Sequence, residues 1–127
     1  MSAKSAVEIG KRLVQLCNAD QSLQAVDELY DEKIVSIEAQ GSEEMPARQE
    51  GIRAIKGKHD WWYANHEVHQ SQAVGPFCGH RDDQFAVLFQ MDVTFKPSRQ
   101  RTQMQEVALY TVSGGKIVQE EFLYQAS

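Results

Sequence analysis

The chain has few of the residues that define specialised classes of protein. Its 127 residues include two cysteines, Cys17 and Cys78, which are too far apart in the sequence to form a CxxC pair. The sequence therefore predicts neither a disulfide framework nor a thiolate metal centre. No apolar run approaches the roughly 20 residues that a membrane-spanning helix needs, and the charged N-terminal segment differs from a secretory signal. We therefore expect a cytoplasmic protein with no membrane association.

Basic residues and familiar catalytic motifs are also scarce. Lysine and arginine number 13 against 18 acidic residues, which gives a formal net charge of −5. Because nucleic-acid binding needs a basic surface, we expect no nucleic-acid partner. The sequence contains no GxSxG elbow, P-loop, GxGxxG fingerprint or Cys/His cluster with metal-ligand spacing. His59 and His66 lie roughly 10 Å apart along a helix and cannot share an ion within it. We expect no metal and no organic cofactor.

Hydrophobic residues recur with a helical period in the N-terminal half. A stripe that starts at Ile9 and steps by four, three and one residues predicts an amphipathic helix over about 5–19. Asp20 is predicted to cap a second, shorter helix. A third helix is predicted over about 51–66. Gly57 lowers the stability of that helix, which suggests close packing against a neighbour.

Beyond the third helix the hydrophobic period changes to two. Residues 85–95 alternate cleanly between two faces and predict a strand. A weaker strand is predicted at 68–74, and an earlier one at 34–39, ahead of the third helix. Helices followed by a meandering antiparallel sheet form the layer pattern of an α+β fold. We expect a single domain over 1–127.

The last two strands are predicted to form a hairpin. Gly114-Gly115 suits a two-residue primed turn between strands at 104–113 and 116–124. That turn would pair Ser113 with Lys116, and Leu109 with Glu120. Both faces of the hairpin are substantially apolar, so one side is expected to line a pocket and the other a subunit contact.

Three side chains are candidates for acid–base catalysis. Glu38 ends the early strand beside apolar neighbours, where partial desolvation would raise its pKa toward the range of a general base. Glu120 stands between apolar residues of the hairpin, but a register slip of one residue would put Glu121 in its place. His66 lies at the end of the third helix, near the expected rim of the pocket. An ordinary surface or packing role is the alternative for each of them.

The same faces supply side chains that we expect to contact a small apolar ligand. Tyr30 and Tyr63 could each donate a hydrogen bond to a ligand carbonyl, with a packing role as the alternative. The predicted ligand-contacting residues are Tyr30, His59, Trp62, Tyr63, Phe89, Met91, Leu109, Phe122 and Tyr124.

Three segments together resemble a known family. They are LYDEKIVSIEAQGS (29–42), EGIRAIKGKHDWWYANH (50–66) and ALYTVSGGKIVQEEFLY (108–124). In this order they resemble the SnoaL-like branch of the nuclear transport factor 2-like superfamily. The resemblance implies a cone-shaped fold in which three N-terminal helices pack on a strongly curved antiparallel sheet, with a pocket between them. It also implies frequent homodimers that form through the outer sheet face.

The resemblance also implies roles for individual residues. A similar segment of the ketosteroid isomerases carries their catalytic aspartate, and Glu38 occupies that position here. Their tyrosine and aspartate donors have no counterparts, since the first helix lacks a tyrosine and the strand position falls near Val107 or Ala108. Ketosteroid isomerisation is therefore not expected. The related cyclases carry acid–base residues on the late strands, where this chain has Glu106 and Glu120.

Two functions are compatible with these features. The first is a small-molecule enzyme of the lyase or isomerase type, in which a glutamate moves a proton on an apolar, carbonyl-bearing substrate. Such general acid–base help is typically worth about 10²–10⁴ in rate. The alternative is a non-catalytic dimeric module that binds a small hydrophobic ligand.

Overall fold

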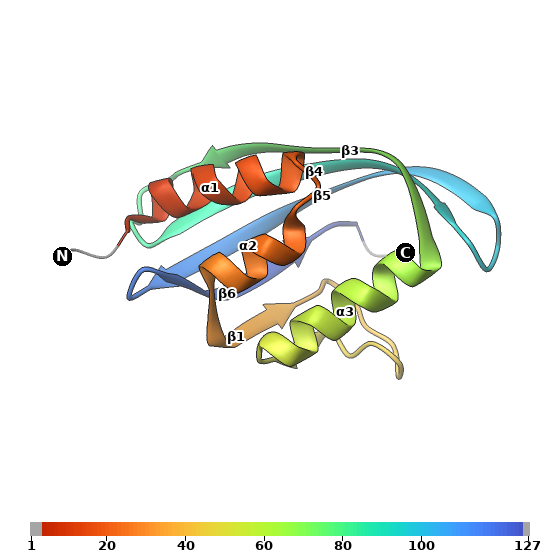
Figure 1. The fold of residues 1–127 in the computed structure, drawn as a ribbon, viewed down its shortest axis with the longest axis horizontal. Helices are drawn as coiled ribbons and strands as arrows, with labels where there is room; N and C mark the ends of the chain where they lie inside the picture. The colour runs from red at the N-terminus through yellow and green to blue at the C-terminus, as the bar shows by residue number, and fades with distance from the viewer. Residues whose placement is uncertain (1–3, 126–127) are drawn as a thin grey trace.

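The computed structural model describes residues 4–125 and has helices on one face of a sheet (Figure 1). The predicted α+β class is confirmed. Within this part of the chain the helices are α1 (Ala6–Asn18), α2 (Ser22–Leu29) and α3 (Ile52–Asn65). The strands are β1 (Tyr30–Ile37), β2 (Arg48–Glu50), β3 (His66–Phe77), β4 (Gln84–Phe95), β5 (Gln100–Ser113) and β6 (Lys116–Leu123).

The two N-terminal helices meet at a tight turn. Ser5 and Glu8 form a capping box that starts α1, and the predicted apolar stripe beginning at Ile9 is buried. The predicted cap of α2 is wrong, because that helix starts after Gln21. Asp20 instead takes a left-handed conformation with φ of 58°. Aspartate tolerates that conformation better than most residues, which lets it close the turn.

Two helical glycines differ in their surroundings. A Cβ at Gly10 in α1 would lie 2.8 Å from a side-chain carbon of Pro76 and 3.0 Å from the Phe85 ring. Gly10 is therefore the glycine that lets a helix approach the sheet closely. The same expectation for Gly57 was wrong, since no atom lies within 4 Å of a Cβ placed there and the residue is exposed.

The strands form one sheet in the order β2-β1-β6-β5-β4-β3. Neighbouring strands are antiparallel except for β1 and β6, which pair in parallel. The expected antiparallel meander is confirmed for β3 to β6. The sheet departs from a purely antiparallel one because the early strand β1 joins it beside the last strand.

The hairpin turn forms as predicted, but the register beyond it does not. Ser113 pairs with Lys116, whereas Glu120 pairs with Tyr110 and Leu109 pairs with Glu121. The predicted pairing of Leu109 with Glu120 is wrong because a β-bulge adds one residue to β6 after the turn. Tyr110 and Glu120 therefore share a face, and Leu109 lies on the opposite one.

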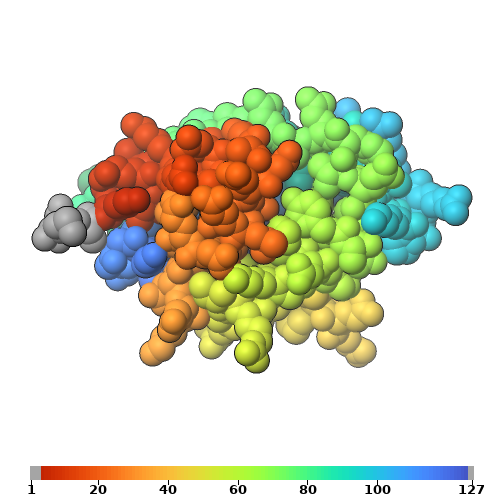
Figure 2. Space-filling view, viewed as in Figure 1, coloured from red at the N-terminus to blue at the C-terminus, as the bar shows by residue number. Residues whose placement is uncertain are grey.

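The core lies between α1 and the inner face of the sheet. The buried side chains there include Ile9 and Leu13 of α1 and Phe85 and Tyr110 of the sheet, whose rings stack at 4.9 Å. Figure 2 shows α1 and α2 in red and orange beside α3 in yellow and green on the face that is viewed. None of the helices in residues 4–125 has the length and apolarity needed to cross a membrane.

Candidate functional site

The inner face of the sheet carries two carboxyl groups among its apolar side chains. Cross-strand pairing puts Glu120 beside Tyr110 of β5 and Ser36 of β1. Glu106 lies four residues before Tyr110 on β5, beside Phe89 of β4. Because side chains on one face recur every second residue, both glutamates point to the side that the helices cover.

Glu120 is enclosed and already has hydrogen-bond partners. Its side chain is 3% exposed, and Tyr30 donates its hydroxyl hydrogen to the Oε2 atom. Burial raises the pKa of Glu120, while hydrogen bonding by Tyr30, the charge of Lys58 and the Ser36 hydroxyl act in the opposite direction. A buried carboxyl group held in this way stabilises the fold and has little room to meet a ligand.

Lys58 of α3 brings a positive charge to the same place. Its Nζ forms an ion pair with Glu38, which follows β1, and donates to the Ser36 Oγ at 2.9 Å. It also lies 4.6 Å from the centre of the Phe122 ring. The side chains of Lys58 and Glu38 are 19% and 21% exposed, so this pair is better shielded from water than a surface ion pair.

Glu106 differs from the other two glutamates because nothing in residues 4–125 hydrogen-bonds to its carboxyl group. Burial raises the pKa of Glu106 to about 7, with a further contribution from the negative charge of Glu38. Lys58 acts against this rise and Glu120 adds to it. A half-buried carboxyl group with a pKa near neutrality and no partner is suited to proton transfer.

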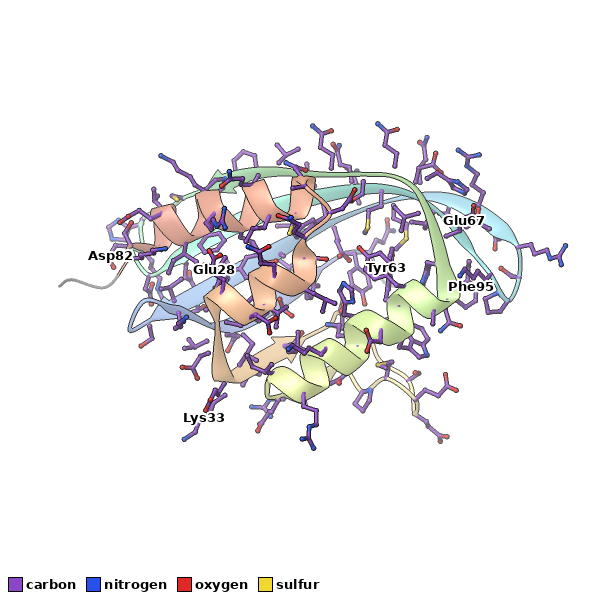
Figure 3. The ribbon with its side chains drawn as sticks, viewed as in Figure 1. Glu28, Lys33, Tyr63, Glu67, Asp82 and Phe95 are labelled. Atoms are coloured by element: carbon purple, nitrogen blue, oxygen red, sulfur yellow. The ribbon has the colours of Figure 1, made fainter. Side chains whose placement is uncertain are left out.

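His66 lies in an aromatic cluster where α3 meets β3. Its ring stacks on Trp62 at 4.3 Å and lies 5.2 Å from the Phe95 ring, while its Nδ1 is 2.8 Å from the Trp62 carbonyl oxygen. Figure 3 labels Phe95 and Tyr63 at this end of the molecule. The described contacts of His66 are aromatic and backbone contacts, so it is not joined to the carboxyl groups.

His59 occupies a different part of α3. Its Nε2 is 3.2 Å from the Ser22 Oγ and its ring lies 4.4 Å from that of Tyr63, which is 47% exposed. Burial lowers the pKa of His59 and thereby favours the neutral ring. The contact with Ser22 joins α3 to α2, which is the structural role considered for this histidine.

The remaining predicted ligand-contacting residues fall on both faces of the sheet. Phe89 and Met91 are half-buried on the inner face, and Phe122 lies there beneath Lys58. The Tyr124 hydroxyl lies 3.5 Å from the Gln40 carbonyl oxygen. Leu109 lies on the outer face, opposite Ala86, and the β-bulge on β6 puts Glu120 on the other face.

Sequence reasoning missed Lys58 and Ser36 and did not select Glu106 as a catalytic candidate. A signal for Lys58 was present, since it follows Ile55 by three residues on α3 and so shares its face. Ser36 lies two residues before Glu38, so the alternation of β1, continued one residue past its end, puts both on the same side. Glu106 shares a face of β5 with Ala108 and Tyr110, but alternation alone does not say which face the helices cover.

The outer face has a hollow of its own. It measures about 430 Å³ and lies over β3, β4 and β5. Six of its lining residues share the outer face by strand pairing, and five of these are glutamines. The lining residues are Gln70, Gln72, Gln90, Met91, Asp92, Gln103, Met104 and Gln105. The apolar pocket expected inside the cone stays a prediction.

No group of three or more histidine, cysteine, aspartate or glutamate side chains within residues 4–125 is arranged to hold a metal ion. Glu38 instead has the Lys58 ammonium as its counter-ion. The charge of Glu38 is therefore compensated by a protein side chain.

The fold and the inner-face cluster define an α+β protein in which helices cover a sheet that carries carboxyl groups. The model of the SnoaL-like domain family matches residues 4–124. The chain therefore belongs to the SnoaL-like domain family. A comparison with curated proteins finds none that matches.

Solved structures agree with this assignment. A protein from Mesorhizobium loti, described as a SnoaL-like polyketide cyclase and also as a carbohydrate phosphatase, is 38% identical with a TM-score of 0.85. The match covers 92% of this chain and 97% of that protein. A protein described as an isomerase from Bacillus subtilis is 18% identical with a TM-score of 0.69, over 92% of this chain and 84% of its own.

A third similar structure is a computationally designed binder of 17-OHP. It is 16% identical with a TM-score of 0.70 and is matched over 96% of this chain and 95% of its own. This structure and the Bacillus one bear on the fold alone. The expected cone-shaped fold of the nuclear transport factor 2-like superfamily is confirmed.

Proposed function

We propose that this protein is an acid–base enzyme of the lyase or isomerase type that acts on an apolar, carbonyl-bearing substrate. The observation that carries the proposal is the state of Glu106, which has no hydrogen-bond partner in residues 4–125 and a pKa raised by burial to about 7. A carboxyl group of this kind can both give and accept a proton at neutral pH. Phe89 and Met91 on the same face supply apolar contacts for the substrate.

In the proposed isomerisation, two glutamates act on opposite ends of the same carbonyl system. The Glu38 carboxylate removes a proton from the carbon beside the carbonyl, and the protonated Glu106 gives its proton to the carbonyl oxygen. The C–H bond breaks, an O–H bond forms and the substrate becomes an enol. Where the substrate carries a C=C bond next to that carbon, this enol is a dienol. Glu38 then returns its proton to the far carbon of the C=C bond, Glu106 recovers its own from the enol oxygen, the carbonyl forms again and the C=C bond moves into conjugation with it. The enzyme is thereby restored.

The other predicted catalytic residues take supporting roles in this proposal. Glu120, enclosed by Tyr30 and Ser36, acts on Glu106 through its charge rather than by touching the substrate. His66 is proposed to orient the substrate at the rim, together with the stacked ring of Trp62.

The test is proton exchange on a small apolar ketone. Exchange of the α-protons of 2-tetralone in deuterated buffer, followed by NMR, should be faster with the protein than without it. Glu106→Gln and Glu38→Gln should each lower the rate by about 10²–10⁴. Glu67→Gln serves as the control, because Glu67 is exposed on the outer face, beside Thr94. Exchange at the wild-type rate in folded Glu106→Gln would contradict the proposal.

A non-catalytic binding module is the second candidate, and one observation favours it. Glu38 and Glu120 are already partnered, by Lys58 and Tyr30, without any ligand. Such satisfied polar groups make a stable wall for a bound hydrophobic molecule. Saturable binding of 2-tetralone, with no acceleration of exchange at any pH between 5 and 9, would favour this alternative.

We also propose that two copies associate through the outer sheet face. Val107 and Leu123 pair across β5 and β6 on that face and are 38% and 47% exposed, and Phe77 of the same face is 55% exposed. Such an exposed apolar group of side chains is typical of a contact surface. Sedimentation velocity should show a dimer that Val107→Lys converts to a monomer. A wild-type monomer at all concentrations would contradict the proposal.

A further inference from the structure

Lys58 contacts more groups of the candidate site than any other side chain described above. It lies on α3, yet it touches Glu38 after β1, Ser36 within β1 and Phe122 of β6. Lys56, one helical half-turn away, pairs only with the exposed Asp27 among the described residues. These two lysines of one helix therefore have different surroundings.

We infer that Lys58 is the positioning residue of this site: it holds Glu38 and Ser36 around one ammonium group and leaves Glu106 as the carboxyl group without a hydrogen-bond partner in residues 4–125. The inference rests on the proposed function for the meaning of that carboxyl group. The contacts on which it depends are present in the structure whether or not the protein is an enzyme.

The hydrogen-bond capacity of the ammonium group supports this assignment. A lysine ammonium has three donors and no acceptor. Glu38 takes one of them and Ser36 takes another at 2.9 Å, while the Phe122 ring faces the ammonium at 4.6 Å. With its donors occupied in this way, Lys58 acts on a ligand through the groups that it arranges.

Ser36 extends the influence of Lys58 to the buried carboxyl group. The residue is 1% exposed and accepts from Lys58, and its hydroxyl group hydrogen-bonds to the carboxyl group of Glu120, its partner on the neighbouring parallel strand. Tyr30 holds the other side of Glu120. Lys58, Ser36, Glu120 and Tyr30 therefore form one connected polar group, in which a change at Lys58 is felt at each member.

Charge gives the inference a measurable consequence at Glu106. The titratable groups that act on Glu106 are Glu38 after β1, Lys58 of α3 and Glu120 of β6. Lys58 is the one cation among these three, and it favours the ionised form of Glu106, whereas the two glutamates oppose it. Removing the cation should therefore raise the pKa of Glu106, since its carboxylate loses an attractive neighbour and Glu38 loses its counter-ion.

The experiment is an NMR titration of the Glu106 side-chain carbon, assigned by its loss in Glu106→Gln. Lys58→Gln should raise the midpoint by at least one pH unit, a tenfold change in proton affinity. Lys58→Arg, which keeps the charge, should stay within about 0.3 unit of the wild type. The matched control is Lys56→Gln, which makes the same change in net charge on the same helix and should leave the midpoint unmoved.

A second measurement needs no variant and so does not depend on how Lys58→Gln folds. The ¹⁵Nζ resonance of Lys58 in the wild-type protein should shift with the same midpoint as Glu106, whereas that of Lys56 should not. A flat Lys58 resonance from pH 5 to 9, or a Glu106 midpoint unchanged in folded Lys58→Gln, would overturn the inference.

The outcomes keep the inference and the proposed function apart. Coupling between Lys58 and Glu106, combined with no exchange of 2-tetralone protons, would retain the positioning role and remove the enzyme. Exchange that Glu106→Gln abolishes but Lys58→Gln leaves unaltered would retain the enzyme and remove the positioning role.

Discussion

Tyr30, at the start of β1, donates a hydrogen bond to the carboxyl group of Glu120 on β6, ninety positions later in the chain. Both side chains are buried, at 8% and 3% exposed. The bond therefore links the first and the last strand in sequence, which are neighbours in the sheet, through two polar groups that water barely reaches.

The Tyr30–Glu120 bond should be visible in a double-mutant cycle. Tyr30→Phe leaves a buried carboxyl group short of a partner, and Glu120→Leu leaves a buried hydroxyl group without its acceptor. Each variant should therefore lower the free energy of unfolding by about 1–3 kcal/mol. The double variant should cost less than the sum by about 1–3 kcal/mol. Urea unfolding gives the energies, with exposed Tyr63→Phe as the control. Additive costs would show that the two groups do not interact.

The stability of the fold should fall as the pH rises through neutrality. Burial raises the pKa of Glu106 from 4.5 to about 7, so the folded state binds this proton more tightly than the unfolded state. The resulting stabilisation is complete below pH 4.5 and is lost as the pH passes 7. Between pH 5.5 and 8.5 the loss should be about 2 kcal/mol, and burial of Glu120 acts in the same direction.

Chemical unfolding of wild type and Glu106→Gln across this pH range measures the effect. His59, whose pKa is lowered, works in the opposite direction below pH 6.5, but both proteins contain it. The difference between the two curves therefore isolates Glu106. Parallel curves would mean that Glu106 titrates normally in the folded protein.

The two helical glycines should respond oppositely to alanine. Gly57→Ala in α3 meets no atom within 4 Å and should stabilise the protein by about 0.5–1 kcal/mol through helix propensity. Gly10→Ala in α1 would press its Cβ against Pro76 and Phe85, and should destabilise by about 1–3 kcal/mol. Thermal unfolding of the pair checks this, and a stabilising Gly10→Ala would show that α1 can move away from the sheet.

The two thiols should differ in reactivity. Cys78 is exposed, whereas burial and the charge of Glu120 raise the pKa of Cys17 to about 11. Because the thiolate is the reactive form, Ellman's reagent at pH 8 should modify Cys78 at least about 100-fold faster. Cys78→Ser should remove the fast phase. A fast phase that survives this substitution would place Cys17 within reach of solvent.

Local patterns in the sequence were sufficient for much of the fold. The period that starts at Ile9 predicted α1, the alternation over 85–95 predicted β4, and the Gly114-Gly115 turn predicted the pairing of Ser113 with Lys116. Each of these features depends on residues that lie close together in the sequence. Such short-range constraints are visible in a single sequence.

The candidate site was harder to predict because it depends on distant contacts. The bulge on β6 put Glu120 opposite Tyr110 instead of Leu109, and nothing in the hairpin sequence marks an inserted residue. The ion pair of Lys58 with Glu38 depends on how α3 packs against β1. A one-residue shift in register exchanges the faces of a strand, so the orientation of Glu106 could not be derived from alternation alone.

The central place of β6 has a consequence for how this chain is made. It lies between β1 and β5, and it is synthesised after the other five strands of residues 4–125. Until it emerges from the ribosome, the sheet consists of two separate pieces, one made of β1 and β2 and the other of β3, β4 and β5. Each piece has an unpaired edge at the place where β6 will join it. Exposed strand edges are templates for aggregation, so a chain interrupted before Lys116 should be a target for chaperones and proteases rather than a partly working protein.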